Sequence, residues 1–368
     1  MDDLARALAA RNEKLIRAVI ARGEAVCPGS LALIGVYGSC LTGRVHPGSD
    51  LDLLILINDE EGYRLQAAFV LEDTGTGYDL YCTPWADLER MAGSPDPHIS
   101  KLMDSRILYV SAPEYKTRLL ALRQRAAAIL AAPFGRADHE KAEKELREAL
   151  ICLARAELAE TLPEVRRWAA EALYFLENAL AMLNKRYFRL GVKDCMEELA
   201  AMTRRPSDLP GLMEGVVSAA TAEDTRRRLA RLLGETEAVF RQAEAALEPA
   251  AKPIPPEALR GTWEEMVSNW RGKLTLAART GDRHLALMSL GSFDAMAREA
   301  AAGALAGKYD ALALYDPADL PGTAARFDGL LDAYLAEYRR AGLEPERYGD
   351  LEAFLRRYLT DELRPTGA

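Results

Sequence analysis

The sequence is poor in the residues that build disulfide frameworks, zinc sites and membrane spans. Its 368 residues include 5 cysteines and 4 histidines. The cysteines are scattered without a C-x-x-C pair, and no histidine has metal-ligand spacing with another histidine or a cysteine, so neither scaffold is expected. No run approaches the ~18 consecutive apolar residues of a membrane-spanning helix. Because the start, Met1-Asp2-Asp3, also lacks the parts of a signal peptide, we expect a cytoplasmic protein with reduced thiols and no membrane partner.

Basic charge is scarce as well. The formal net charge is −9, and residues 1–112 alone hold 10 lysines and arginines against 16 aspartates and glutamates. A protein that grips a nucleic-acid backbone usually carries a basic footprint. This acidic balance disfavours a nucleic-acid partner and favours a small-molecule substrate.

The first part of the chain mixes strand-like and helix-like patterns. Apolar or alternating runs predict strands at 31–37, 51–57, 78–83 and 107–110. Helical spacing predicts helices at 3–25, 63–72, 86–91 and 99–105. The strands are few and short, so we expect a small sheet domain.

From about residue 115 the texture becomes almost wholly helical. Alanine, leucine, glutamate, lysine and arginine, all strong helix formers, dominate up to residue 248. The proline-rich stretch 249–256 is the clearest linker, and the segment after it is again mostly helical. We therefore expect an α+β chain in which a small mixed β-sheet domain is followed by all-α helical bundle regions. The expected division is 1–113, 114–250 and 257–368.

Gly38-Ser39 and the Asp50-Leu51-Asp52 triplet carry the clearest chemical signal. Gly38 and Ser39 directly follow a predicted buried strand, where a turn exposes backbone N–H groups and a hydroxyl to phosphate oxygens. A glycine without a Cβ lets phosphates approach the main chain closely. Residues i and i+2 of a strand face the same side, so Asp50 and Asp52 present two carboxylates together. Such a pair suits Mg²⁺, which binds few protein oxygens together with nucleotide phosphates.

Asp79 is a candidate third acid. It lies in the predicted strand 78–83, whose side chains alternate between polar and apolar. If this strand pairs beside the strand of Asp50 and Asp52, the Asp79 carboxylate faces the same site. It then completes a two-metal site or takes the proton of an acceptor hydroxyl.

These residues resemble the signature of the DNA polymerase beta-like nucleotidyltransferase superfamily. That signature is Gly-Ser, a gap of about ten residues, Asp-x-Asp, and a third acid on a later strand. Gly38, Ser39, Asp50, Asp52 and Asp79 fill these places. The resemblance implies a nucleotidyltransferase that uses ATP or another NTP with Mg²⁺, expected as two ions held by the three aspartates. An acceptor hydroxyl attacks the α-phosphorus and pyrophosphate leaves.

The acidic balance makes the chain look more like the small-molecule branch, which includes aminoglycoside and lincosamide nucleotidyltransferases. Its members join a small mixed-sheet domain to a helical bundle, and related enzymes are often homodimers. The segment 176–187 resembles the bundle helix that faces the nucleotide, where a lysine commonly meets the triphosphate, which assigns Lys185 to nucleotide binding. An antibiotic acceptor, and with it a role in antibiotic resistance, is one implied outcome. The segment 257–368 has no counterpart in the short antibiotic-modifying members.

Two other functions stay open at this point. Minimal nucleotidyltransferases with the same pattern modify a protein partner, as antitoxin-like or regulatory enzymes. A non-catalytic nucleotide-binding scaffold is the other reading, although mutually repelling carboxylates at Asp50 and Asp52 argue for a site that still holds metal.

Overall fold

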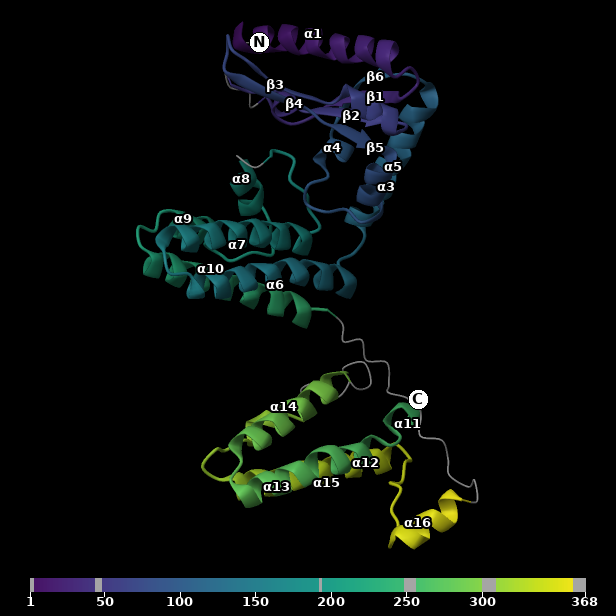
Figure 1. Cartoon of the computed structure of the whole chain (residues 1–368), viewed down its shortest axis with the longest axis vertical. Helices are drawn as coiled ribbons and strands as arrows, with labels where there is room; N and C mark the ends of the chain where they lie inside the picture. Colours follow the sequence, from purple (N-terminus) through teal and green to yellow (C-terminus); the bar gives the residue numbers. More distant parts are fainter. Residues whose placement is uncertain (1–2, 44–47, 192–193, 248–255, 300–308, 360–368) are drawn as a thin grey trace. The chain divides into compact units, whose positions relative to one another are not determined.

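We describe a computed structural model of the chain, covering residues 3–43, 48–191, 194–247, 256–299 and 309–359. The chain divides into two compact units, unit 1 (Met1–Glu248) and unit 2 (Pro249–Ala368) (Figure 1). All but the last residue of the predicted linker 249–256 lie outside the described residues. Within the described residues, no helix is long and apolar enough to cross a membrane.

Unit 1 begins with a small mixed sheet, as the sequence predicts. The strands are β1 (Leu31–Val36), β2 (Leu53–Ile57), β3 (Ala67–Leu71), β4 (Thr76–Leu80), β5 (Cys82–Pro84) and β6 (Arg106–Val110). Four of them form a sheet in the order β5-β2-β1-β6. The β1 strand pairs antiparallel with β2 and β6, whereas β5 lies parallel to β2. Because β1 and β2 are buried along their whole length, each reads as a continuous apolar run in the sequence.

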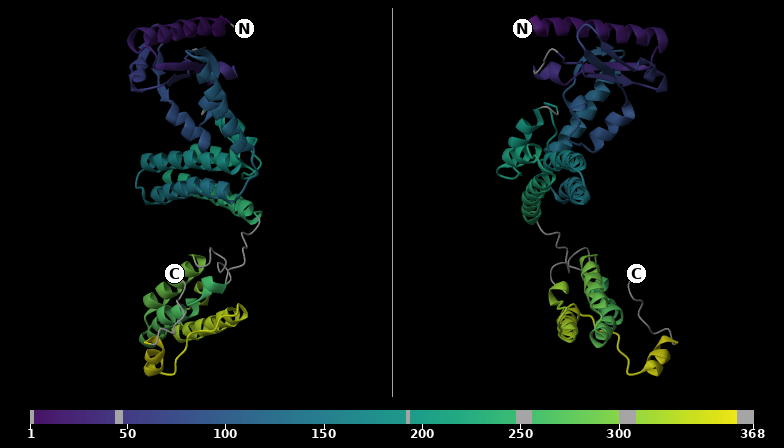
Figure 2. Two further views of the ribbon diagram at one scale, coloured as in Figure 1. Left: turned by 90° about the vertical axis from the view of Figure 1, so that its right-hand side faces the viewer. Right: turned by 60° about the vertical axis from the view of Figure 1, so that its left-hand side comes forward.

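Helices cover both faces of this sheet. They are α1 (Asp3–Val26), α2 (Ser39–Thr42), η1 (Glu60–Leu65), α3 (Trp85–Gly93), α4 (Ser100–Met103) and α5 (Pro113–Ala131). The apolar stripe of α1, including Val19, packs on the face that carries Ile34 and Ile55. Leu33 and Leu54 point to the opposite face, against α3, α4 and α5. Figure 2 shows α1 along one side of the sheet, with the blue helices on the other.

The hairpin of β3 and β4 corrects one expectation. The helix predicted at 63–72 is wrong, because η1 ends at Leu65 and β3 occupies Ala67–Leu71. The β3 strand pairs antiparallel with β4 in a two-stranded sheet of its own. Most of its side chains are exposed or half-buried, so it lacks the clean alternation that marks a strand with one buried face.

A helical bundle completes unit 1. Its helices are α6 (Arg136–Leu158), α7 (Leu162–Leu183), α8 (Cys195–Ala200), α9 (Leu209–Val217) and α10 (Ala222–Ala245). The long pair α6 and α7 shares one apolar core with α9 and α10. Thr161 caps α7 in a capping box with Glu164, and Thr221 caps α10, so both helices begin at a residue whose side chain satisfies a backbone N–H.

Unit 2 is a second helical body with its own core. Its elements are α11 (Pro256–Leu259), α12 (Thr262–Met266), a π-helical turn η3 (Val267–Arg271), α13 (Gly272–Thr280), α14 (Arg283–Glu299), η5 (Leu312–Leu314), α15 (Leu320–Arg340) and α16 (Leu351–Tyr358). Trp270, Phe293 and Phe327 pack edge to face at its centre.

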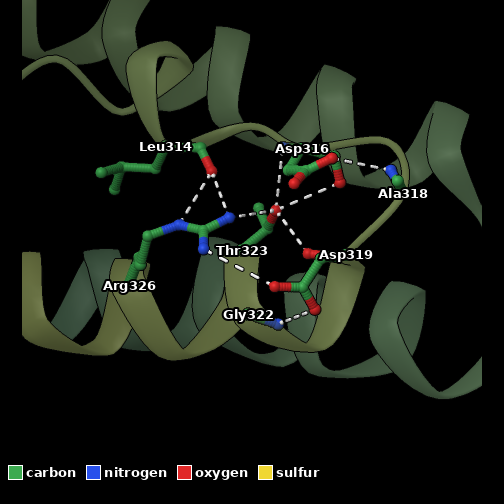
Figure 3. Close-up of polar contacts among 7 residues, drawn as sticks. All are labelled: Leu314, Asp316, Ala318, Asp319, Gly322, Thr323 and Arg326. Atoms are coloured by element: carbon green, nitrogen blue, oxygen red, sulfur yellow. Dashed lines mark hydrogen bonds and ion pairs between the residues drawn. The ribbon is translucent and has the colours of Figure 1, made fainter.

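The start of α15 shows how a Pro-Gly pair is accommodated in a helix. Pro321-Gly322 lies in the first turn of α15, where proline is tolerated because its missing N–H needs no partner. The Asp319 side chain accepts a hydrogen bond from Gly322 N at 2.8 Å, and the Thr323 hydroxyl donates to the carbonyl of Asp319 (Figure 3). Arg326 donates to the carbonyl of Leu314 and joins η5 to this cap.

Candidate active site

Gly38 forms a turn that only glycine can form here. It follows β1, precedes the short helix α2, and has a φ of 71° with a ψ of −149°, a combination reached almost exclusively by glycine. A Cβ built on Gly38 would lie 1.9 Å from Oδ2 of Asp52. The turn and the Asp52 carboxylate are therefore in direct contact, which brings together two parts of the sequence motif.

Asp50 and Asp52 stand immediately before β2. The predicted strand 51–57 begins later, at Leu53, but the extended pairing reaches further because Tyr37 N donates to the carbonyl of Asp52 at 3.1 Å. Leu51 is buried, whereas Asp50 is exposed and Asp52 is half-buried. The alternation predicted for the triplet is present, and both acids stand on the side away from the core.

Asp79 lies in the same region, although its strand does not pair with β2 as the sequence predicts. Its strand, β4, pairs with β3, opposite Ala68, and it is the following strand β5 that pairs with β2. The predicted strand 78–83 is thus two strands in two sheets. Asp79 is nevertheless exposed on the wall of a hollow of about 490 Å³ that Asp50 also lines.

Tyr37 connects the three acids. Burial and the negative charges of Asp52, Asp50 and Asp79, in that order, raise the pKa of its hydroxyl to about 12. Each of the three carboxylates therefore lies near enough to the Tyr37 hydroxyl to act on its pKa. Sequence reasoning missed Tyr37, whose only signal is its place directly before Gly38-Ser39.

Comparison with known families bears on this arrangement of turn and acids. Residues 20–109 match the family model of the nucleotidyltransferase domain. The match supports the nucleotidyltransferase superfamily for this region, and it spans the turn, all three aspartates and the sheet. A comparison with curated proteins finds no match.

The acids in the region that matches the nucleotidyltransferase model suit a metal that binds together with phosphate groups. Among the described residues, no group of three histidines, cysteines or acids is close enough to hold an ion by itself. Asp50 and Asp52 offer hard carboxylate oxygens, and the missing Cβ of Gly38 leaves room for the Asp52 carboxylate itself. Mg²⁺ is usually bound by one or two carboxylates plus substrate phosphates, so this pair fits it, with the phosphates supplying the remaining oxygens.

Lys185 lies just after α7 and is already engaged. Its φ is 52°, and its Nζ pairs with Oδ2 of Asp138 at 3.2 Å, with only 11% of the lysine side chain exposed. It lines a cavity with Asp138 and Lys141 of the bundle. Ser39, the residue after Gly38, begins α2. Lys185 does not line the hollow that Gly38 lines.

Arg189 is the cation on the wall facing Gly38. A hollow of about 500 Å³ is lined by both, together with Thr42 of α2, Ser100 of α4, Asp104 directly after α4, and Glu198 of α8. The Arg189 side chain is 66% exposed, and its Nε lies 3.4 Å from Oδ1 of Asp104. Sequence reasoning missed this residue because it lies beyond the periodic part of the helix, where spacing gives no orientation.

The segment that carries Arg189 is fastened to the nucleotidyltransferase domain. Phe188 N donates to the carbonyl of Pro97 at 2.8 Å, and the Tyr187 hydroxyl donates to Asp104 at 3.1 Å. His98 lies between the rings of Tyr174 and Phe188, with centroids 5.7 and 5.9 Å away. The bundle and the sheet of unit 1 therefore meet at this hollow.

Proposed function

We propose that the chain is an Mg²⁺-dependent nucleotidyltransferase that moves AMP from ATP to a hydroxyl of a small molecule. The observation that carries the proposal is the direct contact between the Gly38 turn and Asp52, next to residues that line two hollows. Gly38 lines one hollow, with Arg189 on its far wall. Asp50 and Asp79 line the other.

The hollow beside Arg189 suits the nucleotide. Its phosphates lie against the main chain of the Gly38-Ser39 turn, whose glycine leaves room for the Asp52 carboxylate, and the Ser39 hydroxyl donates to a phosphate oxygen. Arg189 offers its guanidinium to the phosphates from another part of the wall. Lys185 also binds a phosphate if its ion pair with Asp138 opens. Asp50 and Asp52 would hold Mg²⁺, as one or two ions, which would neutralise phosphate charge.

The second hollow suits the acceptor. The acceptor hydroxyl oxygen attacks the α-phosphorus, its proton passes to the Asp79 carboxylate, and the bond to the departing pyrophosphate breaks. Phe69 and Tyr78 stack beside the acids with centroids 5.1 Å apart, and Val70 is 65% exposed on the same wall. Acidic and apolar groups side by side suit a small molecule with hydroxyl and amino groups, which includes aminoglycoside- and lincosamide-type antibiotics.

The test is nucleotide transfer by the full-length protein. We expect wild type with Mg²⁺ and ATP, offered aminoglycosides, lincosamides and a small-molecule extract, to yield an adduct heavier by one AMP in mass spectrometry. Asp52→Asn keeps the shape of the side chain but removes its charge, so transfer should fall by about 10³-fold or more while the circular dichroism spectrum stays unchanged. An Asp52→Asn variant with wild-type turnover would contradict the proposal.

Two outcomes would redirect it. AMP attached to a protein of a lysate, with every small molecule unmodified, would point to a protein-modifying enzyme of the antitoxin-like or regulatory kind. Nucleotide binding without turnover for any NTP would point to a scaffold. The same protein run on a sizing column with light scattering tests the homodimer that the resemblance implies.

A further inference from the structure

Two neighbouring side chains of α1 reach toward the candidate site from the face of the sheet that α1 covers. Arg11 Nη2 donates to the carbonyl of Ser49 at 2.9 Å, and its guanidinium lies over the ring of Tyr78, 5.3 Å from the centroid. Asn12 is buried, and its Nδ2 donates to Sγ of Cys40 at 3.5 Å. Two adjacent residues thus hold three separate segments.

Each of those contacts is made to the immediate neighbour of a site residue. Ser49 precedes Asp50, Tyr78 precedes Asp79, and Cys40 follows Ser39. Cys40 Sγ also lies 3.8 Å from the carbonyl oxygen of Asp50. One turn of α1 therefore contacts the chain directly beside Ser39, Asp50 and Asp79.

Stability alone does not account for this pair. Within the part of the chain that the structure describes, Nε of Arg11 and Oδ1 of Asn12 are buried without a hydrogen-bond partner. Buried polar atoms without partners lower stability. The apolar residues of α1 that follow, Leu15, Val19 and Ile20, already anchor the helix to the sheet.

We propose that Arg11 and Asn12 are positioning residues, which set the spacing between the Gly38-Ser39 turn and the carboxylates of Asp50 and Asp79. This inference rests on the proposed function for its catalytic meaning. Both residues lie before residue 20, outside the region that matches the nucleotidyltransferase family model. The candidate site in this chain therefore takes part of its support from the portion of α1 that precedes the matched region.

The chain offers a closely matched control. Arg22 on the same helix also donates to a backbone carbonyl, that of Arg64, at 3.0 Å. That bond holds η1 rather than the site. Arg17 is a second control, because it is an exposed α1 arginine paired only with Glu13 at i,i+4.

The first experiment measures the spacing without using activity. Cys40 is half-buried, whereas the other four cysteines are buried, so its modification by a thiol reagent, mapped by mass spectrometry, reports opening of the turn. Loss of one hydrogen bond shifts a local opening equilibrium by roughly 5- to 10-fold, so Arg11→Ala and Asn12→Ala should speed Cys40 modification by about that factor. Arg22→Ala and Arg17→Ala should match wild type. Equal rates in Arg11→Ala and Arg22→Ala would overturn the proposal.

The second experiment measures turnover of the full-length protein, as AMP transfer or as release of pyrophosphate from Mg·ATP. Misplacement of catalytic groups by about 1 Å costs as much as 10²-fold, so kcat of Arg11→Ala should fall 10- to 100-fold. The KM for Mg·ATP should change little, and Arg11→Lys, which keeps a donor and a charge, should recover part of kcat.

The outcomes of the two experiments separate the proposals. If the wild type is inactive but Arg11→Ala still speeds the modification of Cys40, the proposed function is wrong and the positioning role stands. An active wild type with normal kcat in Arg11→Ala would defeat the positioning role alone. A fall in kcat equal to that of Arg22→Ala would show a general loss of stability instead, and would also overturn it.

Discussion

The two walls of the proposed nucleotide site are fixed by different kinds of interaction. The sheet wall, which holds Tyr37, Gly38 and Asp52, is fixed by backbone pairing, since the antiparallel pairing of β1 with β2 extends to Tyr37 and Asp52. The bundle wall, residues 187–190, is fixed by carboxylate side chains. Glu198 accepts hydrogen bonds from the backbone N–H groups of Arg189 and Leu190, each at 3.0 Å, and Asp104 accepts from Tyr187.

This difference separates what each wall can contribute. A backbone ladder tolerates side-chain replacement, so the sheet wall gives a fixed geometry for the chemistry. Side-chain bonds at a partly exposed surface are individually worth about 1 kcal/mol, so the bundle wall depends on a few residues and is easier to alter. Substitutions in the sheet wall should therefore change kcat, and substitutions in the bundle wall should change nucleotide affinity.

The largest effect is expected from Gly38→Ala. The new methyl group would occupy the position of the Asp52 carboxylate, and the backbone conformation is strained for alanine by about 1–3 kcal/mol. Transfer should fall by about 10²-fold or more, because Asp52 must move. Steady-state kinetics measures the fall and urea denaturation measures the stability.

Gly43 provides the control for that substitution. Its φ of 73° is also positive, but a Cβ there meets nothing within 4 Å. Gly43→Ala should therefore lose stability without a comparable loss of kcat. Equal losses of kcat in the two variants would mean that strain, and not the contact with Asp52, explains the effect.

An intermediate effect is expected on the bundle wall, where the two candidate cations can be compared directly. Arg189→Ala should raise the KM for Mg·ATP by roughly 10-fold, the value of one charge-assisted hydrogen bond, with a smaller change in kcat. Lys185→Ala should raise it less, because Lys185 is paired with Asp138 away from the hollow that Gly38 lines. The reverse order would show that the lysine assigned from the sequence is the phosphate ligand.

The smallest effect concerns a tyrosine on each wall. Burial and nearby carboxylates raise the pKa of Tyr37 and of Tyr187 to about 12. The folded state therefore holds each proton more tightly than the unfolded chain does. The resulting stability is fully present below the unfolded pKa, near 10, and is lost as the pH rises toward 12.

Urea denaturation at about pH 9 and about pH 11 measures this loss, which should be about 1–2 kcal/mol for each tyrosine after solvent screening is allowed for. Tyr37→Phe and Tyr187→Phe should each remove part of the pH dependence. Tyr187→Phe should also lower stability at neutral pH, because its hydroxyl donates to Asp104. An unchanged pH dependence in both variants would contradict the cause assigned to these pKa values.

The sequence predicts β1 and β2, the strands of the sheet wall, because an apolar run is a local pattern. The roles of Gly38, Asp50 and Asp52 at their ends stay predictions. Gly38, Asp50 and Asp52 lie at the ends of two buried strands, and the period of a strand alone orients the acids. The bundle wall is different: whether Lys185 or Arg189 faces Gly38 depends on how the chain leaves α7 and on where Glu198 and Asp104 hold it. Those contacts span up to 85 residues between Asp104 and Arg189, and no periodic pattern records them. Arg11 is hidden for the same reason, since a helix pattern does not show which polar side chain meets Ser49.

The hairpin of β3 and β4 has a further consequence. It carries Asp79, Phe69 and Val70 on the acceptor hollow, yet it forms a two-stranded sheet separate from the one that orders the Gly38 turn and Asp52. Its residues other than Asp79 can therefore change without shifting the Gly38 turn or Asp52. Natural selection, or a library randomised at Ala68, Phe69 and Val70, can explore new acceptors in this hairpin while the nucleotide chemistry is inherited unchanged.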